Sequence, residues 1–160
     1  MKHSVFFCYD YGRDRFRVCQ VAENLPLIET FNVKGIWDEG SWLMAGKRGG
    51  NSLNSMIDRE LDGTSVTVVL IGHKTYELDY VDYAISESCS RGNAIVGVKI
   101  DKLLDLGGSY DVAGKNPLAK FRINERETLS DIFDTYDWIK DDGETNLVSW
   151  INDAIRRMTG

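Results

Sequence analysis

The chain has 160 residues, of which 42% are hydrophobic and 28% are charged, and its formal net charge at pH 7 is −6. This length and composition predict a single folded domain over residues 1–160 and exclude a disordered or fibrous chain. The acidic charge and the scarcity of adjacent basic residues argue against nucleic acid as a partner, and no apolar run reaches the roughly 18 residues that would make a membrane a partner.

Three unbroken apolar runs are typical of strands that are buried on both faces of a parallel sheet. They occupy residues 4–9, 64–71 and 94–100. Weaker runs at 27–33 and 132–139 predict two further strands. Segments with apolar residues at helical spacing are found at 16–25, 53–61, 81–89 and 147–158. This alternation predicts an α/β fold, a doubly wound parallel sheet with helices on both faces.

Two stretches, 35–50 and 106–120, combine glycines with few periodic apolar residues and predict long irregular loops. Loops of such length are usually functional or disordered. The first of them carries Trp37, Trp42 and Lys47. Its two tryptophans fit either a contact surface or anchors that hold the loop on the core, and the sequence leaves both interpretations open.

Aromatic and acidic residues follow the first predicted strand, where Tyr9 and Asp10 stand before the next helix. Parallel sheets bind ligands at the carboxyl ends of their strands. Tyr9 or Tyr11 is therefore a candidate for stacking on a ring, and Asp10 is a candidate for binding a hydroxyl group. Asp10 also fits the N-cap of the following helix, which would be a purely structural role.

The motifs of the common cofactor-binding families are missing from the sequence. It contains neither GxxxxGK[ST] nor GxGxxG, so it lacks the signatures of phosphate-binding loops and dinucleotide folds. Its three cysteines are isolated and it has two histidines, so we predict no metal site and no resident cofactor. Residues 1–7 enter a strand-like run without the apolar segment of a signal peptide, and we expect a cytoplasmic protein.

Several segments carry a resemblance to a known family. They are VFFCY at 5–9, the strand–loop–helix stretch at 66–97, DWIKDDG at 137–143 and GKNP at 114–117. The middle stretch is the most specific, because a hydrophobic strand leads into Gly-x-Lys-Thr at 72–75 and then into the aromatic element YVDY at 80–83. On these segments nearly the whole chain resembles a TIR domain, in the TIR-like, ThsB-like branch found in the bacterial Thoeris anti-phage system.

The resemblance implies a flavodoxin-like, three-layer α/β/α fold and a role in antiviral defence. Enzymatic TIR domains cleave the nicotinamide–ribose bond of NAD⁺, and some cyclise the ADP-ribose into a nucleotide signal that activates a separate effector protein. NAD⁺ would then be a substrate and not a cofactor. Residues expected at the substrate, by their position in the family pattern, are Tyr9, Asp10, Trp37, Trp42, Lys47, Asp82 and Tyr83.

One position departs from the family pattern. The catalytic glutamate of the family follows the aromatic element at the start of the helix, and Ala84 occupies that position here. Three explanations are open: an engineered inactive variant, a natural member that has lost catalysis, or replacement of the glutamate by Glu87, one helical turn later. An alanine supplies no charge, so the chain is expected to be slow or inactive unless Glu87 substitutes.

A second hypothesis is a non-enzymatic module, because many TIR domains act by assembling with other TIR domains. Ala84 is compatible with this hypothesis, since a scaffold needs no catalytic carboxylate. A third class, the phosphate-accepting receiver domain, shares the fold but requires an aspartate at the end of its third strand. The run at 64–71 continues into Gly72 without one, which argues against that class.

Overall fold

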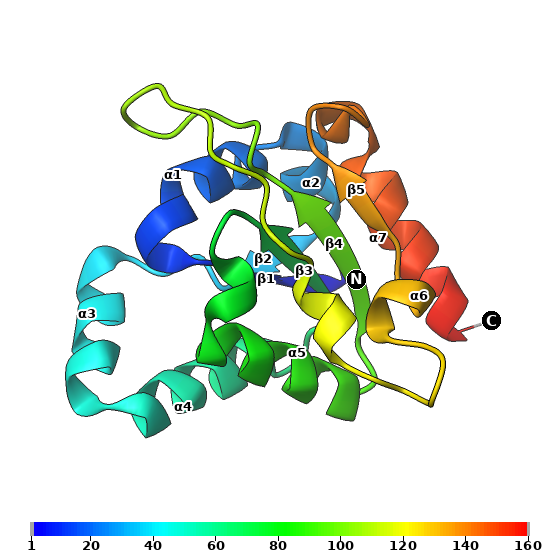
Figure 1. The fold of residues 1–160 in the computed structure, drawn as a ribbon, viewed down its shortest axis with the longest axis horizontal. Coiled ribbons are helices and arrows are strands. Elements are labelled where there is room, and N and C mark those ends of the chain that lie inside the picture. The colour runs from blue at the N-terminus through cyan, green and yellow to red at the C-terminus, as the bar shows by residue number, and fades with distance from the viewer. Residues whose placement is uncertain (1, 160) are drawn as a thin grey trace.

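The computed structural model describes residues 2–159, which form a five-stranded sheet between two layers of helices (Figure 1). The elements in chain order are β1 (Ser4–Cys8), α1 (Tyr11–Ala22), α2 (Leu25–Thr30), β2 (Asn32–Lys34), α3 (Glu39–Arg48), α4 (Gly50–Leu61), β3 (Val66–Ile71), η1 (Thr75–Glu77), α5 (Asp79–Ser90), β4 (Ala94–Lys99), η2 (Pro117–Lys120), α6 (Leu129–Ile132), β5 (Thr135–Asp137) and α7 (Gly143–Thr159).

All neighbouring strands of the sheet are parallel, and their order is β2-β1-β3-β4-β5. This is the flavodoxin-like order, which confirms the predicted fold class. The three strong apolar runs became β1, β3 and β4, and β3 is buried along its whole length. The order of the strands reverses between β1 and β3, so the crevice at their carboxyl ends is the place where such sheets bind ligands.

Alternating side chains of the central strands belong to two separate hydrophobic clusters, one on each face of the sheet. Val5 and Phe7 point to the face that α1, α2 and α7 cover, whereas Phe6 and Cys8 point to the face that α4 and α5 cover. Figure 1 shows these two helical layers on opposite sides of the sheet. Within residues 2–159, no helix is both long and apolar enough to cross a bilayer.

The prediction of a strand over 27–33 was largely wrong. Residues 25–30 form the helix α2, and only 32–34 pair with β1 as the short edge strand β2. Asn24 begins the helix, because its side-chain oxygen accepts a hydrogen bond from the backbone N–H of Leu27. Pro26 suits the first turn, where its missing N–H has no intrahelical partner to lose.

The prediction of an irregular loop over 35–50 was also wrong, because residues 39–48 form the helix α3. Asp38 caps this helix by accepting a hydrogen bond of 2.7 Å from the backbone N–H of Ser41. Near the carboxyl end of the chain, the predicted strand over 132–139 is confined to β5, and α6 precedes it. The loop prediction over 106–120 is confirmed up to the short η2 turn.

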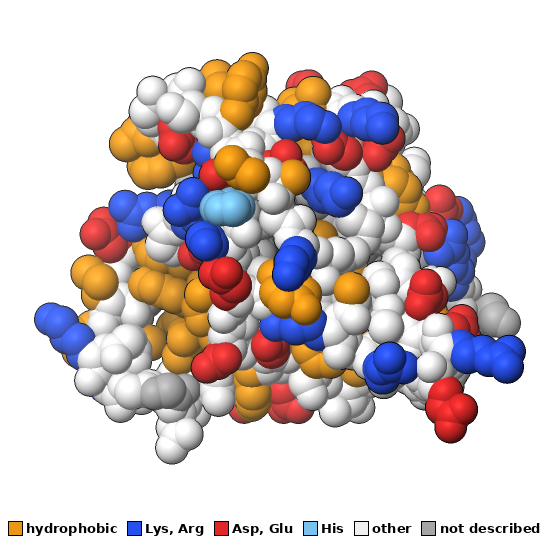
Figure 2. All heavy atoms as spheres, viewed as in Figure 1, with side chains coloured by type: hydrophobic (Ala, Val, Ile, Leu, Met, Phe, Trp, Pro, Cys, Tyr) orange, Lys and Arg blue, Asp and Glu red, His pale blue; other side chains and the backbone are white. Residues whose placement is uncertain are grey.

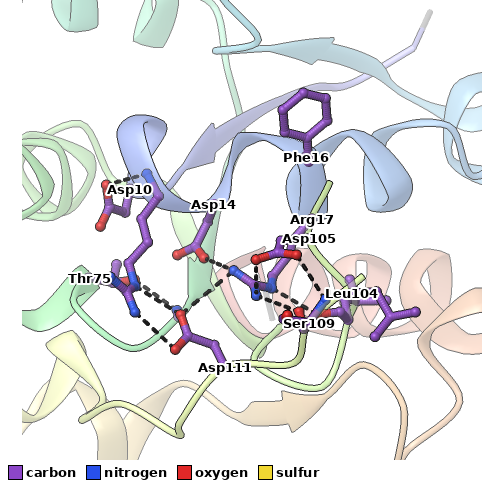
Figure 3. A network of polar contacts seen from close by, with 12 residues as sticks. Asp10, Asp14, Phe16, Arg17, Thr75, Leu104, Asp105, Ser109 and Asp111 are labelled. Atoms are coloured by element: carbon purple, nitrogen blue, oxygen red, sulfur yellow. Dashed lines mark hydrogen bonds and ion pairs between the residues drawn. The ribbon is translucent and has the colours of Figure 1, made fainter. Parts of the chain in front are cut away.

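A buried arginine fastens the long loop after β4 to α1 (Figure 3). Arg17 is 2% exposed, and its guanidinium donates to the carbonyl oxygens of Leu103 and Ser109 and to Oδ1 of Asp14, at 2.8, 3.0 and 2.9 Å. Asp14 itself is fully buried, beside Gly72 at the end of β3. A Cβ atom on Gly72 would lie 2.0 Å from Oδ2 of Asp14, so only glycine fits there.

Candidate active site

The candidate site lies where β1 and β3 end, at the reversal of strand order. Tyr9 and Asp10 follow β1, and the loop after β3 leads into α5. The backbone N–H of Tyr11 donates to the hydroxyl oxygen of Tyr80 at 3.0 Å, which ties the start of α1 to the first turn of α5. Two segments that are distant in sequence therefore meet at the crevice between the strands.

Aromatic side chains from five segments gather at this point. Trp42 of α3 stacks on Tyr11, with ring centroids 4.5 Å apart, and meets Tyr80 edge-on at 5.0 Å. Trp37 lies 5.6 Å from Trp42 and packs against Phe6 of β1. The two tryptophans thus anchor α3 on the core, and offset and edge-on geometries of this kind are favourable beyond the area that they bury.

The tyrosine hydroxyls of the site are held in place by hydrogen bonds. Tyr9 donates to the carbonyl oxygen of Gly35 at 3.1 Å, which fixes the segment that leads to Trp37. Burial raises the pKa of both Tyr9 and Tyr80 well above the ordinary tyrosine value, so both remain neutral at physiological pH. The site therefore offers neutral, rigid aromatic surfaces. We refer to Tyr9, Tyr11, Trp37, Trp42 and Tyr80 as the aromatic cluster.

Two hollows flank Trp37. The smaller one, about 250 Å³, is lined by Tyr9, Tyr11, Arg15, Phe16, Cys19, Ile36, Trp37 and Glu39. The larger one, about 560 Å³, lies between α3 and α4 and shares Trp37 with the smaller one. Figure 2 is seen from the same side as Figure 1 and shows hydrophobic side chains gathered on its left, on the inner side of the α3 segment. The smaller hollow suits an aromatic ring, because most of its walls are flat and apolar.

Asp10 acts as the N-cap of α1, where Oδ1 accepts a hydrogen bond of 3.2 Å from the backbone N–H of Arg13. Its side chain is 8% exposed, and burial raises its pKa above the ordinary aspartate value, against the hydrogen bond that lowers it. Asp10 lines neither hollow. Asp10 therefore has the N-cap role that the sequence analysis considered for it.

Ala84 lies in the second turn of α5 and is 1% exposed, packed in the same hydrophobic cluster as Phe6 and Cys8. It stands four residues after Tyr80, so the two side chains share one face of the helix. Helical side chains lean toward the N-terminal end of their helix. A longer side chain at position 84 would therefore extend toward Tyr80 and the aromatic cluster.

A family model for the Thoeris protein ThsB, TIR-like domain, matches residues 6–105, which is more than half of the chain and includes the whole aromatic cluster and Ala84. The chain belongs to the ThsB TIR-like family. It is also similar to a protein of Bacillus cereus (strain MSX-D12) named "Putative cyclic ADP-D-ribose synthase ThsB1". The two are 29% identical, and the alignment covers 95% of this chain and 100% of that protein. This confirms the family that the sequence motifs indicated.

Glu87, the possible substitute for the ThsB-family glutamate, lies on the side of α5 that faces α4. Its carboxylate is 3.9 Å from the guanidinium of Arg91, which also lies 3.6 Å from Asp58 of α4. Seven residues separate Glu87 from Tyr80, which is about 10 Å along the helix axis. Ala84 is thus one turn from the aromatic cluster, and Glu87 is two turns from it.

Asp82 and Tyr83 bind neighbouring elements. Asp82 forms an ion pair of 2.8 Å with Lys120 of η2, which connects α5 to the turn that follows the 114–117 motif. The hydroxyl of Tyr83 donates to both carboxylate oxygens of Asp58, and this hydrogen bond raises the pKa of Tyr83 to about 12. Both residues hold the start of α5 in place, and neither lines the two hollows beside Trp37.

Lys47 is exposed on α3 and lines neither hollow, whereas the adjacent Arg48 lines the larger one. The loop prediction hid this difference, because helical spacing decides which of two neighbouring residues faces α4. Tyr80 was the other residue that sequence reasoning missed as part of the site. The sequence feature that could have identified Tyr80 is its position four residues before Ala84, which places both on the same helix face.

Acidic, histidine and cysteine side chains do not converge on a metal-binding arrangement in the part of the chain that is described, where no group of three lies close enough to hold an ion. The groups that the site presents are aromatic surfaces, tyrosine hydroxyls and nearby charged side chains.

Proposed function

We propose that the aromatic cluster is an NAD⁺ site and that this chain is a ThsB-like TIR domain whose catalytic position, Ala84, lacks its carboxylate. The observation that carries the proposal is the aromatic cluster itself, at the point of the sheet where flavodoxin-like folds bind nucleotides. The similarity to a protein named as a cyclic ADP-D-ribose synthase supports NAD⁺ as the substrate class.

The reaction places clear demands on such a site. Breaking the bond between nicotinamide and ribose builds positive, oxocarbenium-like charge on the sugar. A carboxylate held beside the ribose stabilises that charge, and flat aromatic side chains hold the nicotinamide ring. Attack by water gives ADP-ribose. Attack by a group of the same molecule closes a ring, which is favoured when the site holds both ends of the substrate together.

Within this proposal the residues have separate roles. The rings of Tyr9, Tyr11 and Trp37 bind the base, and Trp42 with Tyr80 keeps those rings in position. A glutamate at position 84 would supply the negative charge, and Ala84 leaves the site able to bind but slow to react. The product would be a cyclic ADP-ribose-type signal that activates an effector protein in anti-phage defence.

The proposal predicts that the unmodified chain binds NAD⁺ saturably. Trp42→Ala should weaken binding about 5- to 150-fold, because without the Trp42 stack on Tyr11 the rings that contact the base lose their position, at a cost comparable to one base-stacking contact of roughly 1–3 kcal/mol. Titration calorimetry measures both affinities. Tyr136→Ala is the matched control: it removes a comparable stack, on Trp150 with centroids 4.2 Å apart, at the β5 edge of the sheet. Absence of saturable binding, or equal loss in both variants, would contradict the proposal.

Assembly is the second candidate function, and two observations favour it. Ala84 supplies no catalytic carboxylate, and the loop after β4 exposes Leu106, Tyr110 and Val112, each by more than 60% of its surface. Exposed apolar side chains in one loop are typical of contact surfaces. This hypothesis predicts a concentration-dependent increase of mass in light scattering without NAD⁺. A strict monomer at high concentration would rule out self-assembly of the isolated chain.

A further inference from the structure

The hollow between α3 and α4 differs in chemistry from the aromatic hollow on the other side of Trp37. Its walls combine methionines and serines with four charged side chains, those of Asp38, Arg48, Arg59 and Glu60. A cavity of about 560 Å³ falls within the range of small-molecule sites. Its polar groups therefore indicate the chemistry of a ligand.

The two arginines of this hollow have no acidic partner among the described residues. Arg48 comes from the last turn of α3 and Arg59 from the last turn of α4, so they line the hollow from opposite helices. Among residues 2–159, neither guanidinium takes part in an ion pair or donates a side-chain hydrogen bond, although twelve contacts join other arginine and lysine side chains to acidic groups. Both side chains are exposed to solvent, so their donors are available to an anionic ligand.

The acidic side chains of the same hollow are bound to the protein itself. Both oxygens of Asp38 accept hydrogen bonds from Ser41, and these bonds lower the pKa of Asp38 below its ordinary value. Glu60 accepts a hydrogen bond of 3.2 Å from the backbone N–H of Gly35. These donors are neutral, so both carboxylates keep their negative charge. The acidic side chains are nevertheless absent from the adjoining hollow lined by Arg48 and Arg59, and positive charge prevails at that end.

Hydrogen-bond donors of α4 surround the arginine pair. A smaller hollow of about 200 Å³ lies beside the first and is lined by Arg48, Asn51, Ser52, Ser55 and Arg59. Ser52, Ser55 and Arg59 recur at helical spacing and so share one face of α4. The helix begins after Gly49, and no side-chain cap hydrogen bond is present there among the described residues. Helix N-termini of this kind favour negative charge, which adds to the charge of the arginines.

We propose that the α3–α4 hollow binds the diphosphate of a dinucleotide, with Arg48 and Arg59 as its ligands. Trp37 lines this hollow and the aromatic hollow alike, so one molecule lying across Trp37 would have a ring in one hollow and its phosphates in the other. Planar guanidinium groups match phosphate oxygens in pairs, which a lysine cannot do. This inference rests on the proposed function for the identity of the ligand, but the anion site can be tested without it.

Binding of inorganic diphosphate tests the anion site alone, because that probe has no base, ribose or glycosidic bond. Arg48→Gln and Arg59→Gln are each expected to weaken diphosphate binding by about 10-fold or more, since each removes charge-assisted hydrogen bonds. Lys47→Gln is the matched control, because it removes the same charge from the residue just before Arg48 on the same helix. The side chain of Lys47 lines neither hollow. Its affinity should stay within about 2-fold of the unmodified chain. Thermal melting confirms that each variant is folded.

The outcomes separate this inference from the proposed function. An equal loss in Lys47→Gln would mean nonspecific attraction and would overturn the site, as would an unchanged affinity in both arginine variants. Selective loss in the arginine variants, with no saturable NAD⁺ binding by the unmodified chain, would keep the anion site and reject the proposed function. NAD⁺ binding that depends on Trp42 but not on Arg48 or Arg59 would keep the proposed function and reject the anion site.

Discussion

Replacing Arg17 by methionine is expected to lower the free energy of unfolding by about 3–5 kcal/mol, because it removes one partner of a buried charged network. The guanidinium of Arg17 is 2% exposed and satisfies Asp14, which is fully buried, together with two carbonyl oxygens of the loop after β4. Methionine fills a similar volume but supplies no charge and no donor. Asp14 and both carbonyl oxygens would then be left without their partner.

The loss should depend on pH in a defined direction. Burial raises the pKa of Asp14 to about 6, and the bond from Arg17 opposes that rise. Without Arg17 the pKa rises further, so at pH 5 the carboxyl group of the variant is protonated and carries no unpaired charge. The unfolded chain, with an ordinary aspartate pKa of about 3.9, has lost that proton by pH 5. The variant's stability therefore falls as pH rises from 5 to 8, and its deficit is larger at pH 8.

Urea unfolding at pH 5 and pH 8 measures this effect. Arg13→Met provides the matched control, because Arg13 lies on the same helix and binds Asp111 in the same network, but its side chain is 44% exposed. Exposed ion pairs contribute about 0–1 kcal/mol, so this variant should remain near the unmodified chain. Equal losses in the two variants, or a deficit in Arg17→Met that shrinks toward pH 8, would show that burial of the network is not what stabilises the loop.

The central sheet could be predicted from the sequence, because residues 66–71 and 94–98 are apolar apart from Thr67, and runs of this kind are typical of a parallel sheet covered on both faces. The same reasoning failed for residues 27–33, where apolar content suggested a strand. There Asn24 and Pro26 form a helix start whose hydrogen bonds outweigh the strand propensity of a short segment. Local capping is difficult to detect when the helix has only six residues.

The candidate site was predicted in part. Tyr9, Trp37 and Trp42 lie together as expected, since the carboxyl end of β1 has a fixed place in this fold. The helical state of residues 39–48 was missed because glycines at 40 and 46 weaken the helical pattern, whereas tertiary packing of Trp42 on Tyr11 stabilises it. A predicted loop gives no basis for choosing between Lys47 and Arg48, and only the register of the helix shows that Arg48 faces the hollow.

Position 84 is where the largest change in activity is expected. Ala84→Glu should increase nicotinamide release from NAD⁺ by at least about 100-fold over the unmodified chain, a typical effect of one electrostatic group aimed at developing charge. The site around Ala84 is apolar and 1% exposed, so burial should raise the pKa of the new carboxyl group. Only the ionised form stabilises the ribosyl cation, so the rate should rise with pH across that pKa.

The rate gain must come from charge and not from shape, and Ala84→Gln provides the comparison because glutamine has the same length without the charge. Replacing Glu87 by glutamine tests the alternative carboxylate. If Glu87 is the catalytic residue, the unmodified chain is active and Glu87→Gln abolishes that activity. Melting temperatures of all variants show whether the larger side chains are tolerated at this buried position.

The most direct test of the account is therefore the initial rate of nicotinamide release from NAD⁺ by three folded proteins: the unmodified chain, Ala84→Glu and Ala84→Gln. We predict that Ala84→Glu releases nicotinamide at least about 100-fold faster than either of the other two proteins. Equal rates for Ala84→Glu and Ala84→Gln, or activity of the unmodified chain that is lost in Glu87→Gln, would contradict the assignment of Ala84 as the missing catalytic carboxylate.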